Sequence, residues 1–183
     1  MRGKTLSTDT HGEGGSVQEQ AAWRQRHSEV PVRQPVAVIG PREASEAQLA
    51  AAEQIGAALA RIGFTVVCGG RQGIMEAVCR GVAAENGISI GLLPDTEASA
   101  ANVYVTVPIA TGIGEARNAI VARAGFCLVV IGDSYGTLSE VALGLQFGRP
   151  VFGLLGAATV SGVTPCESVD AAVDGVCKVA LGL

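Results

Sequence analysis

The stretch FCLVVIGDSYGTLSEVALGL, residues 126–145, runs from an apolar segment through a polar loop into an amphipathic segment. The first seven residues are mostly apolar, which is typical of a strand covered on both faces of a sheet. After the loop, Leu138, Val141 and Leu145 recur at the spacing of one face of a helix. The stretch therefore predicts one strand–loop–helix unit of the kind that builds a parallel sheet.

The same alternation continues through the chain in both directions. Strands are expected at residues 35–40, 64–68, 88–93, 103–108, 126–132 and 150–155. Helices are expected at residues 45–62, 74–82, 115–124, 138–145 and 167–181. Because no hairpin signal interrupts this order, we predict an α/β fold: a doubly wound, Rossmann-like, mostly parallel sheet with helices on both faces.

The N-terminal segment has a different character. Residues 1–34 are polar, mixed in charge and poor in periodic apolar positions, which predicts a flexible tail with room for one short helix. Trp23 is the exception, and could attach that helix to the domain or to a neighbouring subunit. We expect residues 35–183 to form a single Rossmann-like domain that binds a nucleotide or a phosphate.

Composition excludes several partners. The longest apolar runs are far shorter than the roughly 20 residues that cross a bilayer, so no membrane span is expected. The net charge is −4 and Lys and Arg do not cluster, so nucleic acid is not an expected partner. The five cysteines form no CxxC pair and the N-terminus lacks the apolar core of a signal peptide, which favours the cytoplasm.

Missing residue types narrow the chemistry further. Both histidines, His11 and His27, lie in the N-terminal segment, so the domain lacks a histidine for a nucleophilic triad or a metal site. Both lysines, Lys4 and Lys178, lie near the ends of the chain, which argues against a P-loop and a pyridoxal Schiff base. We therefore expect no metal site and no required cofactor. Carboxylate, arginine, hydroxyl and backbone amide groups remain.

The loops after the predicted strands carry the candidate binding residues. Ligands of open parallel sheets bind at the carboxyl ends of the strands, which here lead into residues 40–43, 69–75, 111–118 and 132–137. Glycines there let backbone amides approach an anion, and the following helix N-termini favour negative charge. We predict a small phosphorylated ligand. Its candidate binding residues are Gly40, Pro41, Gly69, Gly70, Arg71, Gly73, Met75, Thr111, Gly112, Gly132, Asp133, Ser134, Tyr135, Gly136 and Thr137.

Each of these loops also has a purely structural explanation. The glycines of residues 69–73 could simply form the tight turn from strand to helix, with Arg71 as a solvated charge. Asp133 and Ser134 could satisfy turn amides, and Tyr135 could be a packing residue. These alternatives stay open at the level of the sequence.

Arg117 and Glu140 are the candidate catalytic residues. Arg117 falls in the first turn of its predicted helix, where a cation opposes the helix dipole and only Glu115 could offset it locally. Thr137 and Glu140, three residues apart, match a capping box with no chemistry. Alternatively, Glu140 pairs with Arg117 across the site, with the carboxylate orienting water or a ribose hydroxyl and the arginine holding an anion.

Three segments resemble the Lonely Guy family, historically mislabelled lysine decarboxylases. DSYGTLSE resembles its PGGxGTxxE signature, with Gly136, Thr137 and Glu140 matching. GEARN resembles the segment with an essential arginine, here Arg117, and GG…GIMEA resembles its GGG…GLM loop. The resemblance covers roughly residues 35–155. It implies metal-free hydrolysis of a nucleoside 5′-monophosphate to free base and ribose 5-phosphate, with amides around Gly136 holding the phosphate. Lysine decarboxylation is not expected.

The chain departs from the Lonely Guy signatures at two places, and a second group of the same superfamily is similarly close. Gly132, Asp133 and Ser134 stand where the family has PGG, and Asn118 stands where it has lysine, so both changes reduce favourable charge for a nucleoside monophosphate. TGIGEARN followed by GTLSEVALGL is at least as similar to the molybdenum cofactor carrier proteins of the same superfamily, which bind a phosphorylated pterin. The phosphoribohydrolase is the first prediction, and a non-catalytic carrier of molybdenum cofactor or a related nucleotide-like ligand is the alternative. Both groups imply a homodimer or a larger homo-oligomer.

Overall fold

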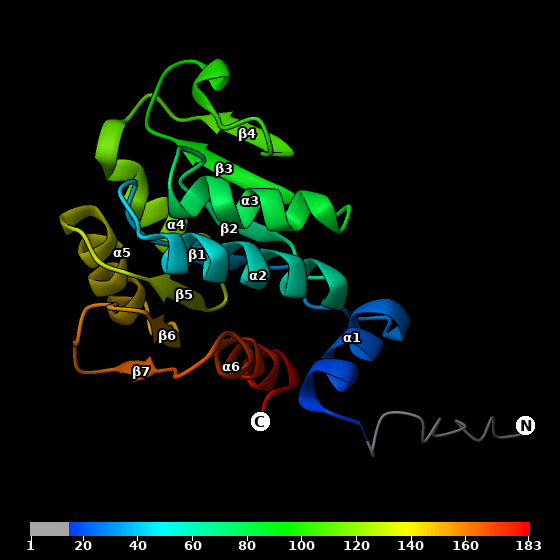
Figure 1. Cartoon of the computed structure of the whole chain (residues 1–183). Coiled ribbons are helices and arrows are strands. Elements are labelled where there is room, and N and C mark those ends of the chain that lie inside the picture. The colour runs from blue at the N-terminus through cyan, green and yellow to red at the C-terminus, as the bar shows by residue number, and fades with distance from the viewer. Residues whose placement is uncertain (1–14) are drawn as a thin grey trace, which may run out of the picture.

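The computed structural model describes residues 15–183, which form one seven-stranded parallel sheet in the order β4-β3-β2-β1-β5-β6-β7 (Figure 1). The strands are β1 (Val36–Ile39), β2 (Val66–Cys68), β3 (Ser89–Leu93), β4 (Val107–Ala110), β5 (Leu128–Ile131), β6 (Val151–Leu154) and β7 (Val163–Pro165). The α/β, Rossmann-like fold predicted from the alternation of strand and helix is confirmed.

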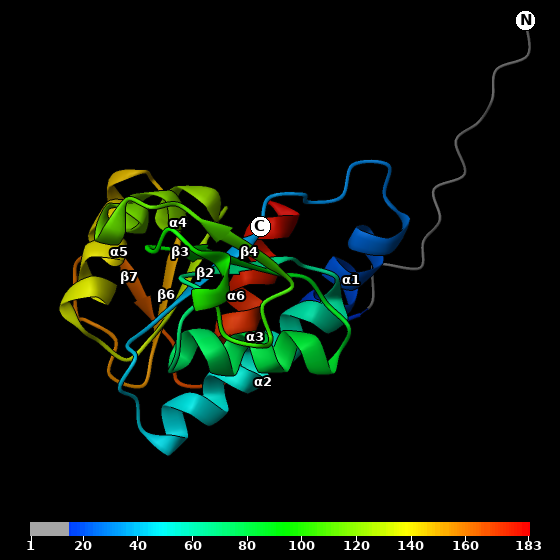
Figure 2. The same ribbon diagram turned by 90° about the horizontal axis from the view of Figure 1, so that it is seen from above.

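Helices cover both faces of the sheet (Figure 2). The α-helices are α1 (Val17–His27), α2 (Glu46–Ile62), α3 (Ile74–Ala84), α4 (Asn118–Ala124), α5 (Tyr135–Gln146) and α6 (Val169–Leu181). Short 3₁₀ helices are η1 (Ala98–Ala100) and η2 (Gly114–Arg117). No helix within residues 15–183 has both the length and the apolar character to cross a bilayer.

The core is split by the sheet into two layers. Val36 and Val38 of β1 belong to the layer that includes α2, α3 and α6, whereas Ala37 and Ile39 belong to the layer of α4 and α5. This alternation follows from the period of two along a strand. All four side chains are buried, which is why the strand contains no polar residue.

The strand order reverses next to β1. The chain proceeds outward from β1 through β2 and β3 to β4, then returns through α4 to β5 on the other side of β1. Loops from β1 and β5 therefore diverge to opposite faces and leave a crevice at the carboxyl end of the sheet. This topology positions the candidate site.

Two strands differ from the expectation. β4 begins at Val107 rather than at residue 103, because the Asn102 side chain holds the preceding segment against the loop after β2, donating to the carbonyls of Gly70 and Arg71 at 3.2 and 3.0 Å. β7 was not predicted from the sequence. It has only three residues and ends at Pro165, so its apolar signal is weak, but it pairs with β6 at the edge of the sheet.

The described part of the N-terminal segment contains the short helix that the sequence allows. In α1, the Gln18 side-chain amide donates to Asp174 and Arg24 donates to the carbonyl of Ala180, both at 2.8 Å, so α1 contacts α6. Trp23 is 38% exposed and stacks on His27 of its own helix. Residues 1–14, where the predicted flexible tail begins, lie outside the described residues. The domain boundary at residue 35 stays a prediction.

Candidate functional site

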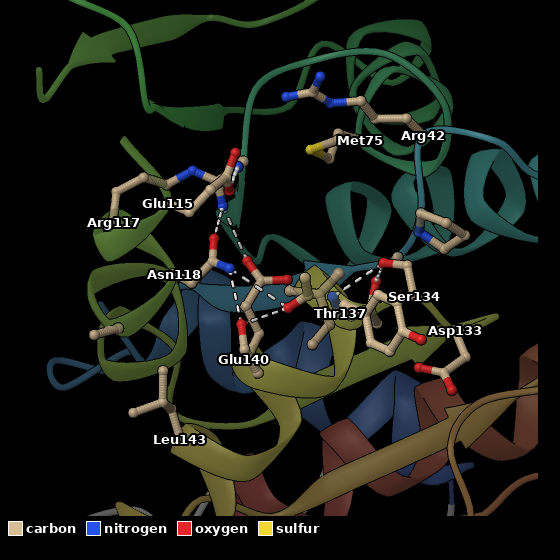
Figure 3. Close-up of a pocket in the computed structure, with 18 of the residues that line it drawn as sticks. Arg42, Met75, Glu115, Arg117, Asn118, Asp133, Ser134, Thr137, Glu140 and Leu143 are labelled. Carbon is tan, nitrogen blue, oxygen red and sulfur yellow. Dashed lines mark hydrogen bonds and ion pairs between the residues drawn. The ribbon is translucent and has the colours of Figure 1, made fainter. Parts of the chain in front are cut away.

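A cleft of about 1090 Å³ opens at the carboxyl ends of β1, β2 and β5, beside the reversal of strand order (Figure 3). Its lining comes from the loop after β1, the loop after β2, the η2–α4 junction and the first turns of α5. A volume of this size accommodates a ligand larger than a simple phosphate.

Many of the predicted residues meet in this cleft. Those that line it are Gly40, Pro41, Gly69, Met75, Arg117, Asp133, Ser134, Tyr135, Gly136, Thr137 and Glu140. Predicted residues that do not line it are Gly70, Arg71, Gly73, Thr111, Gly112 and Gly132.

The residues outside the cleft shape the loops around it. Gly70 and Gly73 have φ angles of 73° and 72°, so both take the left-handed conformation that glycine permits. A Cβ on Gly73 would lie 2.3 Å from the carbonyl oxygen of Arg42, which makes this glycine necessary for the contact between the two loops. Arg71 forms an ion pair with Asp95. A structural role in the turn thus accounts for Gly70 and Gly73, whereas Arg71 is ion-paired and is not a solvated charge. A part for these residues in ligand binding stays a prediction.

Arg117 and Glu140 form a buried ion pair. Only 4% of Arg117 and 6% of Glu140 is exposed, and Arg117 Nη1 donates to Glu140 Oε1 at 3.1 Å. The capping-box explanation of Glu140 is wrong, because α5 begins at Tyr135 and its cap is Ser134, whose Oγ accepts from the Thr137 amide at 3.1 Å. Glu140 therefore lies one turn further along the helix, on the side that faces the cleft.

The protonation of Glu140 is sensitive to its surroundings. Burial raises the pKa of Glu140 to about 7, against the opposing effect of the Arg117 guanidinium. The carboxylate of Glu115 adds to this increase in the pKa. Glu140 can therefore act as a hydrogen-bond acceptor or a donor close to neutral pH.

Asn118 connects Arg117 to the first turns of α5. Its Oδ1 accepts from Arg117 Nη1, and its Nδ2 donates to Ser139 Oγ at 2.9 Å. Ser139 Oγ in turn donates to the carbonyl of Gly136 at 2.7 Å. The arginine and the N-terminus of α5 are thus fixed relative to one another.

The first turn of α5 is suited to an anion. The backbone N–H groups of Tyr135 and Gly136 precede the first intrahelical hydrogen bonds, so the helix offers free donors and a positive dipole end at the cleft. Asp133 also lines the cleft, immediately before the cap. Its negative charge limits how much anionic charge this turn can accept.

Sequence reasoning missed several lining residues. These are Ile39, Arg42, Glu43, Glu115, Ala116, Asn118, Ala119, Ser139 and Leu143. Most of them fall in the four loops that the topology singles out, so the loops were predicted more accurately than the individual side chains. Leu143 could have been found from Glu140, because residues three positions apart on a helix lie on the same face.

The family model described as the SLOG cluster4 family matches residues 33–174. The chain belongs to the SLOG cluster4 family. This assignment confirms the predicted kinship with the Lonely Guy-like superfamily that includes molybdenum cofactor carrier-like members. An uncharacterized protein of Archaeoglobus fulgidus is 32% identical to this SLOG cluster4 protein over 139 residues, which cover 76% of this chain and 91% of the relative.

Two solved structures show the same fold over nearly their whole length. The molybdenum cofactor binding protein of Rippkaea orientalis has a TM-score of 0.76 and 30% identity, covering 81% of the SLOG cluster4 chain and 98% of the other. The molybdenum cofactor carrier protein of Chlamydomonas reinhardtii has a TM-score of 0.73 and 33% identity, with coverages of 81% and 99%. This protein is therefore similar in fold and sequence to two proteins named for that cofactor.

Proposed function

We propose that this protein binds the molybdenum cofactor, or a closely related phosphorylated pterin, and carries it without hydrolysing it. The observation that carries the proposal is the cleft of about 1090 Å³ at the reversal of strand order. The fold that forms this cleft is similar to that of two proteins named for this cofactor, and the match covers 98% and 99% of their chains. The alternative predicted from the sequence is thus better supported than the phosphoribohydrolase.

The lining of the cleft suits a flat heterocycle attached to a phosphate. Met75 and Leu143 provide apolar surface, and Glu140 can exchange hydrogen bonds with ring N–H groups and acceptors. The free amides at the first turn of α5 would meet the phosphate. The residues present therefore fit such a ligand as cargo, and binding needs no covalent step.

The test is whether the protein acquires the cofactor. The full chain would be purified from cells that make molybdenum cofactor, and assayed for molybdenum and for pterin that becomes fluorescent after oxidation. Arg117→Ala should lose most of the bound pterin, because it leaves Glu140 unpaired in the cleft. Arg61→Ala is the matched control, since Arg61 pairs with Glu85 away from the cleft. Wild-type protein free of pterin, and unable to take up added cofactor, would refute carriage.

One observation keeps hydrolysis of a nucleoside 5′-monophosphate as a second candidate. A carboxyl group whose pKa lies at about 7 in a cleft is suited to general acid–base chemistry at neutral pH. Incubation with a panel of nucleoside 5′-monophosphates and chromatography of the products would detect free base. Release by the wild type and not by Glu140→Gln would establish a phosphoribohydrolase, whereas no release from any member would leave carriage.

We further infer a cytoplasmic homodimer or larger homo-oligomer. On the edge strand β4, Val107 and Ile109 are 42% and 43% exposed, and their separation by two residues places them on the same face. Such apolar surface is typical of a subunit interface. Light scattering on the purified chain measures the oligomer size, and a monomer at micromolar concentration would contradict the inference.

A further inference from the structure

The cleft carries more acidic than basic side chains. Its charged lining residues are Arg42, Glu43, Glu115, Arg117, Asp133 and Glu140. A phosphate that binds in this acidic cleft needs a cationic side chain whose charge is not already compensated by carboxylates of the protein. The two arginines differ sharply in this respect.

Arg117 is occupied by the protein itself. Its Nη1 donates to both Asn118 and Glu140, and its Nη2 lies 3.8 Å from a carboxylate oxygen of Glu115. Gly69 packs against the guanidinium, since a Cβ there would lie 2.9 Å from Nη2, and the Nε atom is buried without a hydrogen-bond partner among the described residues. A guanidinium that is 4% exposed and already contacts Asn118, Glu140 and Glu115 presents little surface to an anion.

Arg42 is available. Its side chain is exposed, lines the cleft, and makes no hydrogen bond or ion pair within residues 15–183. In the view of Figure 3, its side chain runs above that of Met75. The hydrogen bond from Arg71 lowers the pKa of Asp95, and the charge of Arg42 makes the smallest contribution to that lowering.

The backbone beneath Arg42 is fixed although the side chain is free. The amide of Ile74 donates to the carbonyl of Pro41 at 3.1 Å. Gly73 packs against the carbonyls of Pro41 and Arg42 so closely that a Cβ there would lie 2.5 and 2.3 Å from them. This loop also borders the loop before α5, since a Cβ on Gly132 would lie 3.4 Å from the Pro41 ring. The loop that carries Arg42 is therefore held against both the loop after β2 and the loop that leads into α5.

We propose that Arg42, and not Arg117, is the side chain that binds the phosphate of the ligand. This assignment rests on the proposed function and specifies which charge recognises the cargo. The phosphate lies between the Arg42 guanidinium and the first turn of α5, and the Arg117–Glu140 pair lies beneath the heterocycle. Charge-assisted contacts of this kind are the strong ones in a partly enclosed site.

The test compares a phosphorylated ligand with its unphosphorylated form. Guanosine 5′-monophosphate and guanosine are suitable probes beside the cofactor, because guanine shares the 2-amino-4-oxopyrimidine ring of a pterin. Calorimetric Kd values would be measured for the wild type, Arg42→Ala, Arg42→Lys and Arg33→Ala. Arg33 is the matched control, because it is exposed and does not line the cleft.

Arg42→Ala should weaken binding of the cofactor and of guanosine 5′-monophosphate by about tenfold or more, and leave guanosine unchanged. Arg42→Lys should retain part of the preference for guanosine 5′-monophosphate over guanosine. Arg33→Ala should bind both as the wild type does. Equal weakening of nucleotide and nucleoside would show that Arg42 acts by packing, which overturns the assignment. If the wild type binds the cofactor and Arg42→Ala binds it equally well, this assignment fails while carriage stands. If the wild type binds none of the probes, both fail.

Discussion

The ionisation of Glu140 predicts a pH dependence of stability that one substitution removes. Burial raises the pKa of this carboxyl from its ordinary 4.5 to about 7 in the folded protein. The folded state therefore holds a proton that the unfolded chain releases between these two values. Stability from this group is fully present below pH 4.5 and is lost as the pH rises to about 7.

The size of the effect follows from the two pKa values. The difference between 4.5 and about 7 corresponds to about 3 kcal/mol in the free energy of unfolding. In Glu140→Gln the side chain has similar size and no titratable proton, so this loss is absent. Between pH 4.5 and 8, the wild type should therefore lose about 3 kcal/mol more stability than the variant.

Urea denaturation at a series of pH values measures this difference directly. Other carboxyl groups titrate in both proteins, so the informative quantity is the difference between the two curves. Glu43→Gln is the matched control, because Glu43 lines the same cleft but is exposed. Parallel curves for the wild type and Glu140→Gln would refute the reasoning that burial dominates the energy of Glu140.

Two glycines give further predictions. In Gly69→Ala the new Cβ would lie 2.7 Å from Sδ of Met75 and 2.9 Å from Nη2 of Arg117, so both side chains must move, and cofactor binding should weaken by about tenfold; an unchanged Kd would contradict this. In Gly81→Ala the Cβ would lie 2.0 Å from the carbonyl oxygen of Glu53 where α3 crosses α2, and thermal unfolding should show a loss of about 1–3 kcal/mol. Gly136→Ala is the control for stability, because its Cβ would lie no closer than 3.8 Å to Ser134 Oγ and helix propensity favours alanine over glycine by up to about 1 kcal/mol. Equal losses of stability in Gly81→Ala and Gly136→Ala would disprove the packing argument.

The sequence predicted a structural feature correctly where the residues that form it lie close together in the chain. The capping box of Ser45 and Gln48, which marks the start of α2, can be read from the sequence because both partners lie within four residues. The strands of the sheet could be predicted because burial on both faces requires a continuous apolar run, as in β1 and β5. The same physical reason explains why β7, which is largely exposed, gave no signal.

Glu140 shows where this reasoning fails. Thr137 and Glu140 match the spacing of a capping box as well as Ser45 and Gln48 do, yet Glu140 pairs with Arg117, 23 residues earlier. The spacing alone cannot distinguish the two, because the distant arginine reaches Glu140 only after α4 and α5 have packed on the same face of the sheet. The Arg117–Glu140 pair was one of two alternatives until the tertiary structure excluded the other.

The sequence by itself determined the α/β class, the alternation of strands and helices from β1 to β6, and the four loops that lead into the cleft, because these depend on periodicity and on residues near one another in the chain. Only the tertiary structure decided which side chains of those loops share the cleft, that Arg117 is buried against Glu140 and that Arg42 is exposed. Charge compensation and burial depend on distances between residues far apart in the chain, and those distances exist only once the sheet has formed.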